Sequence, residues 1–241
     1  MVPVLESVSL GVAPGEFVAI LGPSGCGKST LLNLIAGLEE PSGGTVSING
    51  VIHRRRAGLC AYMHQKDLLL PWRSVLDNAI LPLEVQGVPR REARQRALAL
   101  MEAFGLKGFE NAYPFTLSGG MRQRAAFLRT VLSGKSIVLL DEPFGALDAL
   151  TRAGLQEWLA SLWESLHLTV LLVTHDVEEA LFLADRVVVL SPRPARVQGV
   201  VAVELPRPRL RGVVTSPPFV HLKEQVLRLL LVGSVTQEVP R

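Results

Sequence analysis

A glycine-rich segment near the amino terminus constrains the fold of this chain more than any other feature. Residues 22–30 fit the phosphate-binding loop pattern G-x-x-x-x-G-K-[ST]. The residues of this loop are Gly22, Pro23, Ser24, Gly25, Cys26, Gly27, Lys28, Ser29 and Thr30. The apolar run Phe17–Leu21 precedes the loop, and residues 28–36 carry large aliphatic side chains at helical spacing. We therefore expect a buried strand, a glycine loop and a helix in that order.

This order of elements suits the binding of a nucleoside triphosphate. Glycines let backbone N–H groups curl around phosphates, and a helix N-terminus adds partial positive charge. Lys28 is expected to reach the β- and γ-phosphates, and the Ser29 hydroxyl is expected to bind Mg²⁺. The competing interpretation is a glycine-rich turn with an incidental lysine, and the flanking strand and helix argue against it.

The composition is that of a globular protein. The 241 residues are 48% apolar and 20% charged, which is enough chain for one large α/β domain or two small ones. No apolar run has the length of a membrane span, and the first residues lack the pattern of a signal peptide. We therefore expect a soluble protein of the cytoplasm, and we expect Cys26 and Cys60 to be reduced thiols.

The charge pattern gives little support for a nucleic-acid partner. The net charge is +3, and most basic residues are scattered along the chain. Residues 54–56 are the only tight run of arginines, and we expect a solvated hairpin or loop there, with a basic face near anionic lipid as the minor alternative.

Several apolar runs predict the strands of a sheet covered on both faces. The runs at Phe17–Leu21, 136–140 and 169–173 are short and continuous in Val, Ile or Leu. Further strands are expected at 187–190 and 200–203, near the edge of the sheet. Residues 45–48 followed by Asn-Gly predict an antiparallel hairpin before residue 60.

Helical patterns occupy much of the remaining chain. We expect a helix from Pro89 to Phe104, a helix that contains Trp158 and Trp163, and an amphipathic helix over 219–231. The two tryptophans lie at helical spacing, which favours packing in the core over stacking on a cofactor.

Acidic residues and a histidine follow two of the predicted strands. Asp141 and Glu142 end one strand, and His175 follows another. Asp141 suits a carboxylate that holds Mg²⁺, and Glu142 could polarise an attacking water. If the strands are parallel, His175 lies on the same rim as Lys28 and Asp141. The competing interpretation of the acidic pair is a cap for the next helix.

A second anion-binding pattern opens another helix. Ser118, Gly119 and Gly120 supply a hydroxyl and bare backbone N–H groups at a predicted helix N-terminus. A single phosphate loop does not need this segment. The pattern therefore indicates that it faces the γ-phosphate of a nucleotide bound to another copy of the chain.

From about Leu5 to Arg209 the sequence resembles the ATP-binding subunit of an ABC transporter. The motifs that carry the resemblance occur in the family's order: Walker A at 22–30, the Q-loop Gln65, the signature at 117–121, Walker B ending at Asp141 with Glu142, the D-loop Asp148 and the switch His175. It is most similar to the importer branch for nitrate, sulfonates, taurine and pyrimidine or thiamine precursors. That assignment depends on residues 69–73 and 206–209.

The resemblance implies a P-loop NTPase fold of the RecA-like type. Its core is a mainly parallel sheet flanked by helices, with a small antiparallel β subdomain and an inserted α-helical subdomain. We expect a single domain over 1–241, with the core at 1–70 and 134–205, the helical subdomain at 71–133 and a C-terminal extension at 206–241.

The resemblance also implies cofactors, roles and partners. ATP and Mg²⁺ are the expected ligands, with Ser29, Gln65 and Asp141 at the metal and with Glu142, His175 and Lys28 catalytic. A homodimer would place Ser118–Gly120 of one copy on the ATP of the other, with the D-loop Asp148 nearby. The segment that begins at Asp67 and ends at Arg73 would receive the coupling helix of a membrane permease, which in turn works with an external solute-binding protein. The expected location is the cytoplasmic face of the inner membrane, as a peripheral subunit, and no nucleic-acid partner is expected.

The sequence departs from the family pattern at two places. No aromatic residue precedes Phe17, although family members place one on an early strand to stack on adenine. We expect that the start codon is assigned too far downstream, with looser binding of adenine as the alternative. His64 stands where Phe or Pro is usual. We expect this difference to be neutral.

Three other functions stay open at this point. A non-transport ABC ATPase in a soluble or nucleic-acid complex is the main alternative, although such proteins usually have a long coiled coil or two ATPase domains. A P-loop kinase would leave the signature segment without a role. An ATPase that assembles or regulates a membrane complex cannot be separated from an importer by these residues, and neither the solute nor the direction of transport can be read from them.

Overall fold

Strand β1 (Phe17–Leu21) lies inside a six-stranded sheet in the computed structural model of the chain, which describes residues 3–235. The strand order is β4-β5-β6-β1-β7-β8. The other strands are β4 (Ala61–Met63), β5 (Ile137–Asp141), β6 (Thr169–Thr174), β7 (Arg186–Leu190) and β8 (Val197–Ala202). All neighbouring strands are parallel except β7 and β8. The expected mainly parallel sheet is therefore confirmed.

The register of the parallel strands brings their carboxyl ends to one rim. Leu21 at the end of β1 pairs with Thr174 of β6, and Asp141 at the end of β5 pairs with Val173. The loop after β1, the acidic pair after β5 and the segment after β6 therefore start at the same level. This is the edge at which open α/β sheets bind their ligands.

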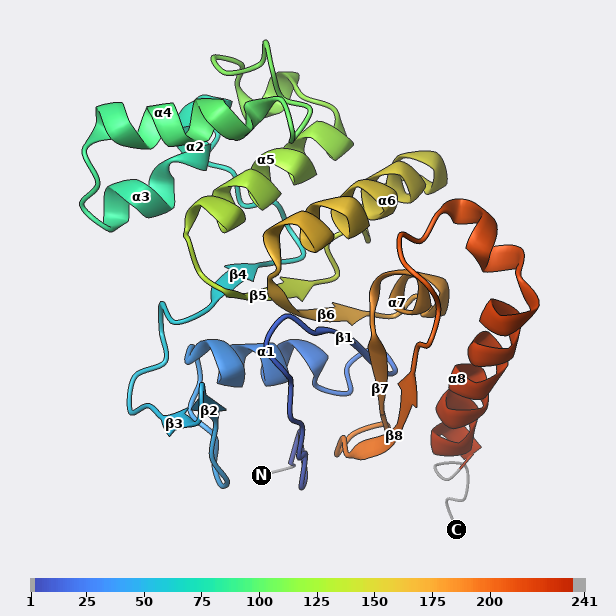
Figure 1. Ribbon diagram of the computed structural model, residues 1–241. Helices are drawn as coiled ribbons and strands as arrows, with labels where there is room; N and C mark the ends of the chain where they lie inside the picture. The colour runs from blue at the N-terminus through green and yellow to red at the C-terminus, as the bar shows by residue number, and fades with distance from the viewer. Residues whose placement is uncertain (1–2, 236–241) are drawn as a thin grey trace.

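Helices cover both faces of the sheet. Figure 1 shows α1 on one side, and α5 and α6 on the other. The helices are α1 (Lys28–Ala36), α2 (Val75–Ala79), α3 (Leu81–Val85), α4 (Arg90–Met101), α5 (Gly119–Leu132), α6 (Ala149–Leu166), α7 (Val177–Leu183) and α8 (Pro217–Val235), with single 3₁₀ segments at Pro114–Thr116 and Arg211–Thr215. Within residues 3–235, no helix combines the length and the apolar character needed to cross a membrane.

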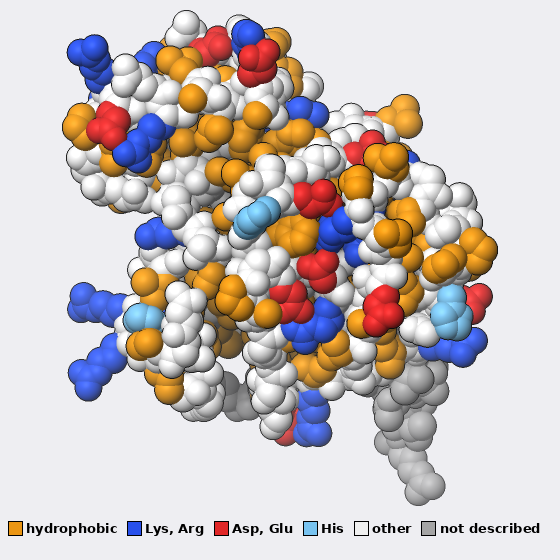
Figure 2. Space-filling view, viewed as in Figure 1, with side chains coloured by type: hydrophobic (Ala, Val, Ile, Leu, Met, Phe, Trp, Pro, Cys, Tyr) orange, Lys and Arg blue, Asp and Glu red, His pale blue; other side chains and the backbone are white. Residues whose placement is uncertain are grey.

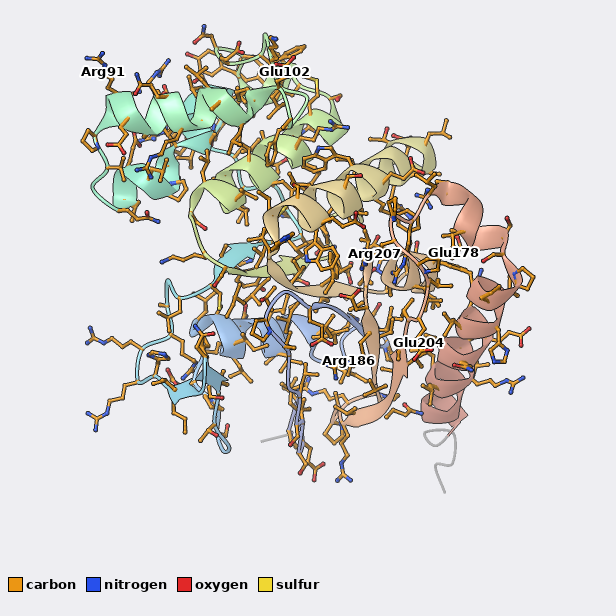
Figure 3. The ribbon with its side chains drawn as sticks, in the orientation of Figure 1. Arg91, Glu102, Glu178, Arg186, Glu204 and Arg207 are labelled. Atoms are coloured by element: carbon orange, nitrogen blue, oxygen red, sulfur yellow. The ribbon has the colours of Figure 1, made fainter. Side chains whose placement is uncertain are left out.

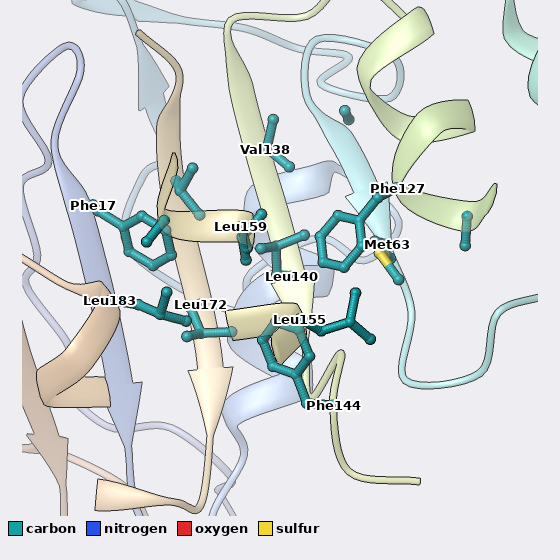
Figure 4. Close-up of a cluster of buried hydrophobic side chains, with 14 of the residues drawn as sticks. Phe17, Met63, Phe127, Val138, Leu140, Phe144, Leu155, Leu159, Leu172 and Leu183 are labelled. Carbon is teal, nitrogen blue, oxygen red and sulfur yellow. The ribbon is translucent and has the colours of Figure 1, made fainter. Parts of the chain in front are cut away.

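The core explains why the strand sequences are continuous in apolar residues. Phe17, Ala19 and Leu21 pack with the layer of α5, α6 and α7, whereas Val18 and Ile20 pack with α1. All five side chains of β1 are fully buried. Each fully buried large aliphatic or aromatic side chain contributes about 2 kcal/mol through the hydrophobic effect. Figure 4 shows the larger cluster, in which Phe17 and Leu172 lie on one side and Phe127 and Met63 on the other.

The predicted tryptophan packing is confirmed. Trp158 and Trp163 are partly buried against the larger core. The Trp158 ring meets Phe104 edge-on at 5.2 Å, and the Trp163 ring meets Phe17 edge-on at 5.6 Å. Both tryptophan rings therefore pack within the protein core.

A small antiparallel hairpin precedes residue 60, as the Asn-Gly pattern predicts. Strands β2 (Ser47–Ile48) and β3 (Val51–Ile52) pair with each other. Asn49 and Gly50 both have positive φ, of 53° and 77°, which is the geometry of a two-residue turn between antiparallel strands. The strand begins at Ser47 and not at Thr45, because only two residues on each side pair.

Other boundaries differ from the sequence predictions. Strand β8 covers Val197–Ala202 and not 200–203, because its antiparallel pairing with β7 extends through an irregular register near Leu190. The final helix is longer than expected, at Pro217–Val235 instead of 219–231. The expected helix over 89–104 is found as Arg90–Met101, with Pro89 at its N-cap.

The expectation of a solvated loop over residues 54–56 is wrong for Arg56. This side chain is only 4% exposed, and it donates hydrogen bonds to Leu34 O and Glu39 O and pairs with Glu40. Gly37, with φ of +74°, permits this close approach, because a Cβ atom there would lie 2.6 Å from Cβ of Arg56. Arg56 thus binds carbonyl groups at the C-terminal end of α1, where cations are favoured.

Candidate functional site

The phosphate-loop residues form a tight turn between β1 and α1. Gly25 and Gly27 have φ values of 76° and 117°, which non-glycine residues rarely adopt, and Gly27 is the N-cap of α1. Lys28 is 6% exposed, and its Nζ donates to Gly22 O at 2.8 Å and to Pro23 O at 3.0 Å. The loop therefore carries a buried cation and a helix N-terminus in one place, which is a suitable arrangement for phosphate groups.

The loop also packs against the segment before β1. A Cβ atom on Gly27 would lie 2.8 Å from Val4 Cγ1 and 2.9 Å from Leu5 Cδ2. Cys26 is buried in the same turn, and burial raises the pKa of its thiol. Cys26 and Cys60 are both free thiols, so they form no disulfide, in agreement with the sequence prediction.

Asp141 lies buried at the end of β5, next to the phosphate loop. The Ser29 side chain interacts with its carboxyl group, and the Tyr62 hydroxyl lies 3.4 Å from its Oδ2. Burial raises the pKa of Asp141 above its usual range. No sequence pattern identifies Tyr62, whose only signal is its place three residues before Gln65 on the neighbouring strand β4.

The Ser29 and Asp141 oxygens suit a hard divalent cation. Mg²⁺ prefers oxygen ligands and is commonly held by one or two carboxylates together with substrate phosphates. Within residues 3–235 there is no group of three or more His, Cys, Asp or Glu side chains that could hold a metal ion alone. A cation at this site would therefore share its shell between Ser29, Asp141 and phosphate oxygens.

Glu142 brings two other predicted residues together. Its Oε2 lies 3.3 Å from Nε2 of Gln65 and 3.2 Å from Nδ1 of His175. Glu142 has a φ of +45°, and its backbone N–H donates to Val173 O at 2.8 Å. Left-handed backbone at a non-glycine residue costs energy and occurs often at functional sites. The structure thus places Gln65, Glu142 and His175 in direct contact.

A small pocket lies beside this contact. Its lining includes Glu142, Gly145, Arg152 and His175. The His175 side chain is 58% exposed and that of Glu142 is 21% exposed, so both can be reached from outside the chain.

The signature residues stand at the start of α5, as the sequence predicts. Ser118 is the N-cap, and its hydroxyl accepts a hydrogen bond from Met121 N. Gly119 and Gly120 form the first turn, and a Cβ atom on Gly120 would lie 2.8 Å from Thr151 of α6. Asp148 caps α6 in the same way by accepting from Thr151 N at 3.0 Å. The signature and the D-loop of one chain therefore pack together.

The phosphate loop and the signature lie on different layers of the chain. The loop leads into α1 on one face of the sheet, and the signature opens α5 on the other face (Figure 1). The structure does not bring Ser118–Gly120 to the phosphate loop of the same chain.

The segment from Asp67 to Arg73 presents apolar side chains at the surface. Leu68 is 52% exposed and Trp72 is 71% exposed. Arg129 of α5 donates to the carbonyl groups of Asp67 and Leu68, and these bonds attach the segment to α5. The role of Arg129 could not be predicted, because nothing in its local sequence pattern distinguishes it from a solvated helix arginine.

Comparisons with known proteins agree with this geometry. Residues 5–145 match the protein family described as ABC transporter. The chain is 46% identical over 237 residues to the formylaminopyrimidine import ATP-binding protein ThiZ of Halalkalibacterium halodurans, covering 97% of this chain and 92% of that protein. It is 44% identical over 231 residues to the taurine import ATP-binding protein TauB of Rhizobium johnstonii, covering 94% and 88%.

A solved structure is similar as well. It is described as a dimeric post-hydrolysis state of the ATP-binding cassette MJ0796 bound to ADP and Pi. The similarity has a TM-score of 0.71 at 32% identity and covers 84% of this chain and 91% of the other.

Proposed function

This chain belongs to the ABC transporter family as an ATP-binding subunit, and we propose that it hydrolyses ATP to drive the import of a small solute through a membrane permease. The reaction converts ATP and water to ADP and phosphate. The observation that carries the proposal is the shared Glu142 carboxylate, which contacts Gln65 and His175 at the rim that also holds the phosphate loop.

Each residue of this rim has a distinct role in the proposed reaction. The loop N–H groups and Lys28 bind the β- and γ-phosphates. Glu142 orients the attacking water in line with the γ-phosphate and accepts its proton, and His175 holds Glu142 and supports the developing charge. Bound Mg²⁺ would supply charge stabilisation on the phosphoryl oxygens, with Ser29, Asp141 and Gln65 as the residues that hold it.

The complete site needs a second copy of the chain. Ser118, Gly119 and Gly120 offer a hydroxyl and backbone N–H groups at a helix N-terminus, but they lie on a different layer from their own phosphate loop. A head-to-tail homodimer would place them on the γ-phosphate bound by the partner, with Asp148 close to the same interface. The dimeric description of the similar cassette supports this arrangement.

The exposed segment from Asp67 to Arg73 is the proposed contact with the permease. The segment joins Gln65 at the site to the expected helical subdomain over 71–133. Its exposed Leu68 and Trp72 side chains offer an apolar surface for a short helix of the permease. Closing and opening of the ATP dimer would then move the permease between its two states. The chain would act as a peripheral subunit on the cytoplasmic face of the membrane, together with an external solute-binding protein.

The names of similar proteins bear on the solute class. Two similar proteins are named for the import of formylaminopyrimidine and of taurine. We therefore propose a pyrimidine precursor or a sulfonate such as taurine, with nitrate as the remaining member of the branch.

The face of the molecule shown in Figure 2 gives no support to a nucleic-acid-associated ATPase. On the face shown in Figure 2, basic side chains alternate with acidic and apolar ones, without a broad basic area. Nucleic-acid binding depends chiefly on clustered positive charge.

The proposal is tested by gentle detergent extraction of the tagged chain from its native cells, followed by quantitative mass spectrometry. We expect a multi-span permease in near-equal amount, and we expect the purified complex to hydrolyse ATP faster in the presence of the solute-binding protein loaded with its solute. Recovery of soluble or nucleic-acid partners alone would contradict transport and leave the ATPase chemistry in place.

A further inference from the structure

A buried carboxylate lies just behind the catalytic histidine. Glu179 is on α7, four residues after His175, and it is only 4% exposed. It lines the same small pocket as Glu142 and His175. Carboxylates are rarely buried to this extent without a specific role or partner, and the proposed reaction does not use Glu179.

The partners of Glu179 connect it to the strand end that carries His175. Oε2 of Glu179 accepts a hydrogen bond from Nε2 of Gln156 at 2.9 Å, and Glu179 lines the same pocket as Thr174. Thr174 directly precedes His175, and its hydroxyl also accepts from the backbone N–H of Asp176 at 3.0 Å. The residues on both sides of His175 are therefore bonded to each other, and the backbone N–H of Glu179 donates to Oδ1 of Asp176 at 3.1 Å.

The same network continues to the C-terminal extension. Oε1 of Gln156 accepts a hydrogen bond from Nη2 of Arg211 at 2.6 Å. The Gln156 amide is thus held in one orientation, with its nitrogen toward Glu179 and its oxygen toward Arg211. Arg211 also donates from its backbone to Glu157 and lies over the ring of Phe182.

The extension is firmly attached around this point, so the network has a fixed end. Arg207 donates to Asp185 and to Leu183 O, and Lys223 of α8 pairs with Glu178 of α7. In Figure 3, the labelled Arg207 and Glu178 mark the region where the extension passes α7. Because the extension is anchored in this way, its Arg211 can hold Gln156 in place, and Gln156 can in turn hold the Glu179 carboxylate.

We propose that Glu179 is a positioning residue for His175, and that the hydrogen-bonded series from Arg211 through Gln156 to Glu179, which lines the pocket beside Thr174, makes the C-terminal extension part of that support. The proposal rests on the catalytic role of His175 proposed above. None of these four side chains is among those that bind ATP. Weakening the network therefore slows the chemical step and leaves the affinity for ATP as it is.

The test compares steady-state ATP hydrolysis, equilibrium ATP binding and the NMR spectrum of ¹³C,¹⁵N-histidine-labelled protein in a set of variants. In Glu179→Ala we expect kcat to fall about tenfold with KM within twofold, together with a shift of the His175 imidazole resonances. Glu179→Gln keeps an acceptor oxygen of similar size and should restore most of kcat. Gln156→Leu and Arg211→Met break the hydrogen-bonded series at the end that lies in or next to the C-terminal extension. Both variants should also lower kcat.

Two controls make the result decisive. Glu102→Gln alters an exposed carboxylate that pairs with Lys107, outside this network, and should leave kcat and the His175 resonances unchanged. His175→Ala tests the premise, because wild-type activity in that variant would contradict the proposed role of His175 itself. If His175→Ala is slow, two results would overturn the positioning role of Glu179. One is a wild-type kcat in folded Glu179→Ala and Arg211→Met proteins. The other is a loss of kcat in these variants without a shift of the His175 resonances.

Discussion

The Nδ1 atom of His175 lies 3.2 Å from Oε2 of Glu142, although the two residues follow different strands of the sheet. The parallel register makes this contact possible, because Asp141 pairs with Val173 and the two chain segments leave the rim together. The same Glu142 oxygen is 3.3 Å from Gln65. Glu142, the proposed base, therefore contacts both His175 and Gln65.

Replacing Glu142 should separate binding from hydrolysis. Glu142→Gln keeps the shape of the side chain but removes its ability to accept a proton, so kcat should fall at least about 100-fold, a typical loss for a general base. ATP affinity should stay within about threefold of the wild type. A coupled phosphate-release assay and equilibrium dialysis measure both quantities, with the exposed Glu102→Gln as the matched control. Wild-type turnover in Glu142→Gln would contradict the assignment.

Replacing Lys28 should weaken the binding of ATP, in contrast to the replacement of Glu142. Lys28→Ala removes a buried cation from the phosphate loop, so the Kd for ATP should rise at least about tenfold, which corresponds to about 1.4 kcal/mol. Calorimetric titration with ATP and Mg²⁺ checks the prediction. Lys107→Ala, on an exposed turn, should bind ATP as the wild type does. Unchanged affinity in Lys28→Ala would contradict the phosphate-loop assignment.

Glu179 should make the stability of the protein depend on pH. Burial, together with the charge of Asp176, raises its pKa from 4.5 to about 7. Thr174, Gln156 and Arg152 lower the pKa but do not outweigh burial. Between these two values the folded state keeps a proton that the unfolded state has lost. The free energy of unfolding should therefore decrease as pH rises from 4.5 to 7, by on the order of 3 kcal/mol, and Glu179 should add no further change above pH 7.

Urea unfolding across this pH range measures the contribution. Glu179→Gln cannot titrate, so the difference in unfolding free energy between wild type and variant should show the slope. Glu178→Gln is the neighbouring control and should leave the slope in place. Equal pH profiles for wild type and Glu179→Gln would show that Glu179 titrates at its ordinary pKa.

Arg209 should be important for the stability of the C-terminal extension. Its guanidinium is 3% exposed and donates to five backbone carbonyl groups at the end of α7 and after β8. Arg209→Ala leaves these acceptors buried without partners, and we expect a loss of about 3 kcal/mol. Thermal and urea unfolding test this, and Arg228→Ala, on an exposed face of α8, should change stability by less than about 0.5 kcal/mol. A stable Arg209→Ala protein would contradict this role.

The parallel core could be predicted from sequence because its strands carry their own signal. β1 and α1 are found at the predicted bounds, and β5 and β6 are each found within one residue of them. A strand buried on both faces has to be apolar throughout, so its pattern is visible without any knowledge of its neighbours.

The buried arginines could not be predicted for the opposite reason. Arg56 and Arg209 are buried because carbonyl groups from distant segments converge on them. Their local sequence is that of a basic loop and of a Pro- and Arg-rich tail. Likewise, the positive φ of Glu142 depends on its N–H bond to Val173 of β6, which no local pattern encodes.

The candidate site was predictable as a set of residues but only partly as a geometry. The motifs name Lys28, Asp141, Glu142 and His175, and the structure places them at one rim. The roles of Ser118–Gly120 and Asp148 toward a partner copy stay predictions, because one chain contains only half of the proposed interface.

The association state of Glu142→Gln with ATP tests the central claim most directly. Sedimentation velocity should show a monomer without nucleotide and a dimer with ATP and Mg²⁺, because ATP is bound between two copies and is not hydrolysed. A double variant with Ser118→Arg should bind ATP and remain monomeric, whereas Ser165→Arg, on an exposed part of α6, should still dimerise. Persistence of the ATP-dependent dimer with Ser118→Arg, or a monomer of Glu142→Gln at saturating ATP, would contradict the account.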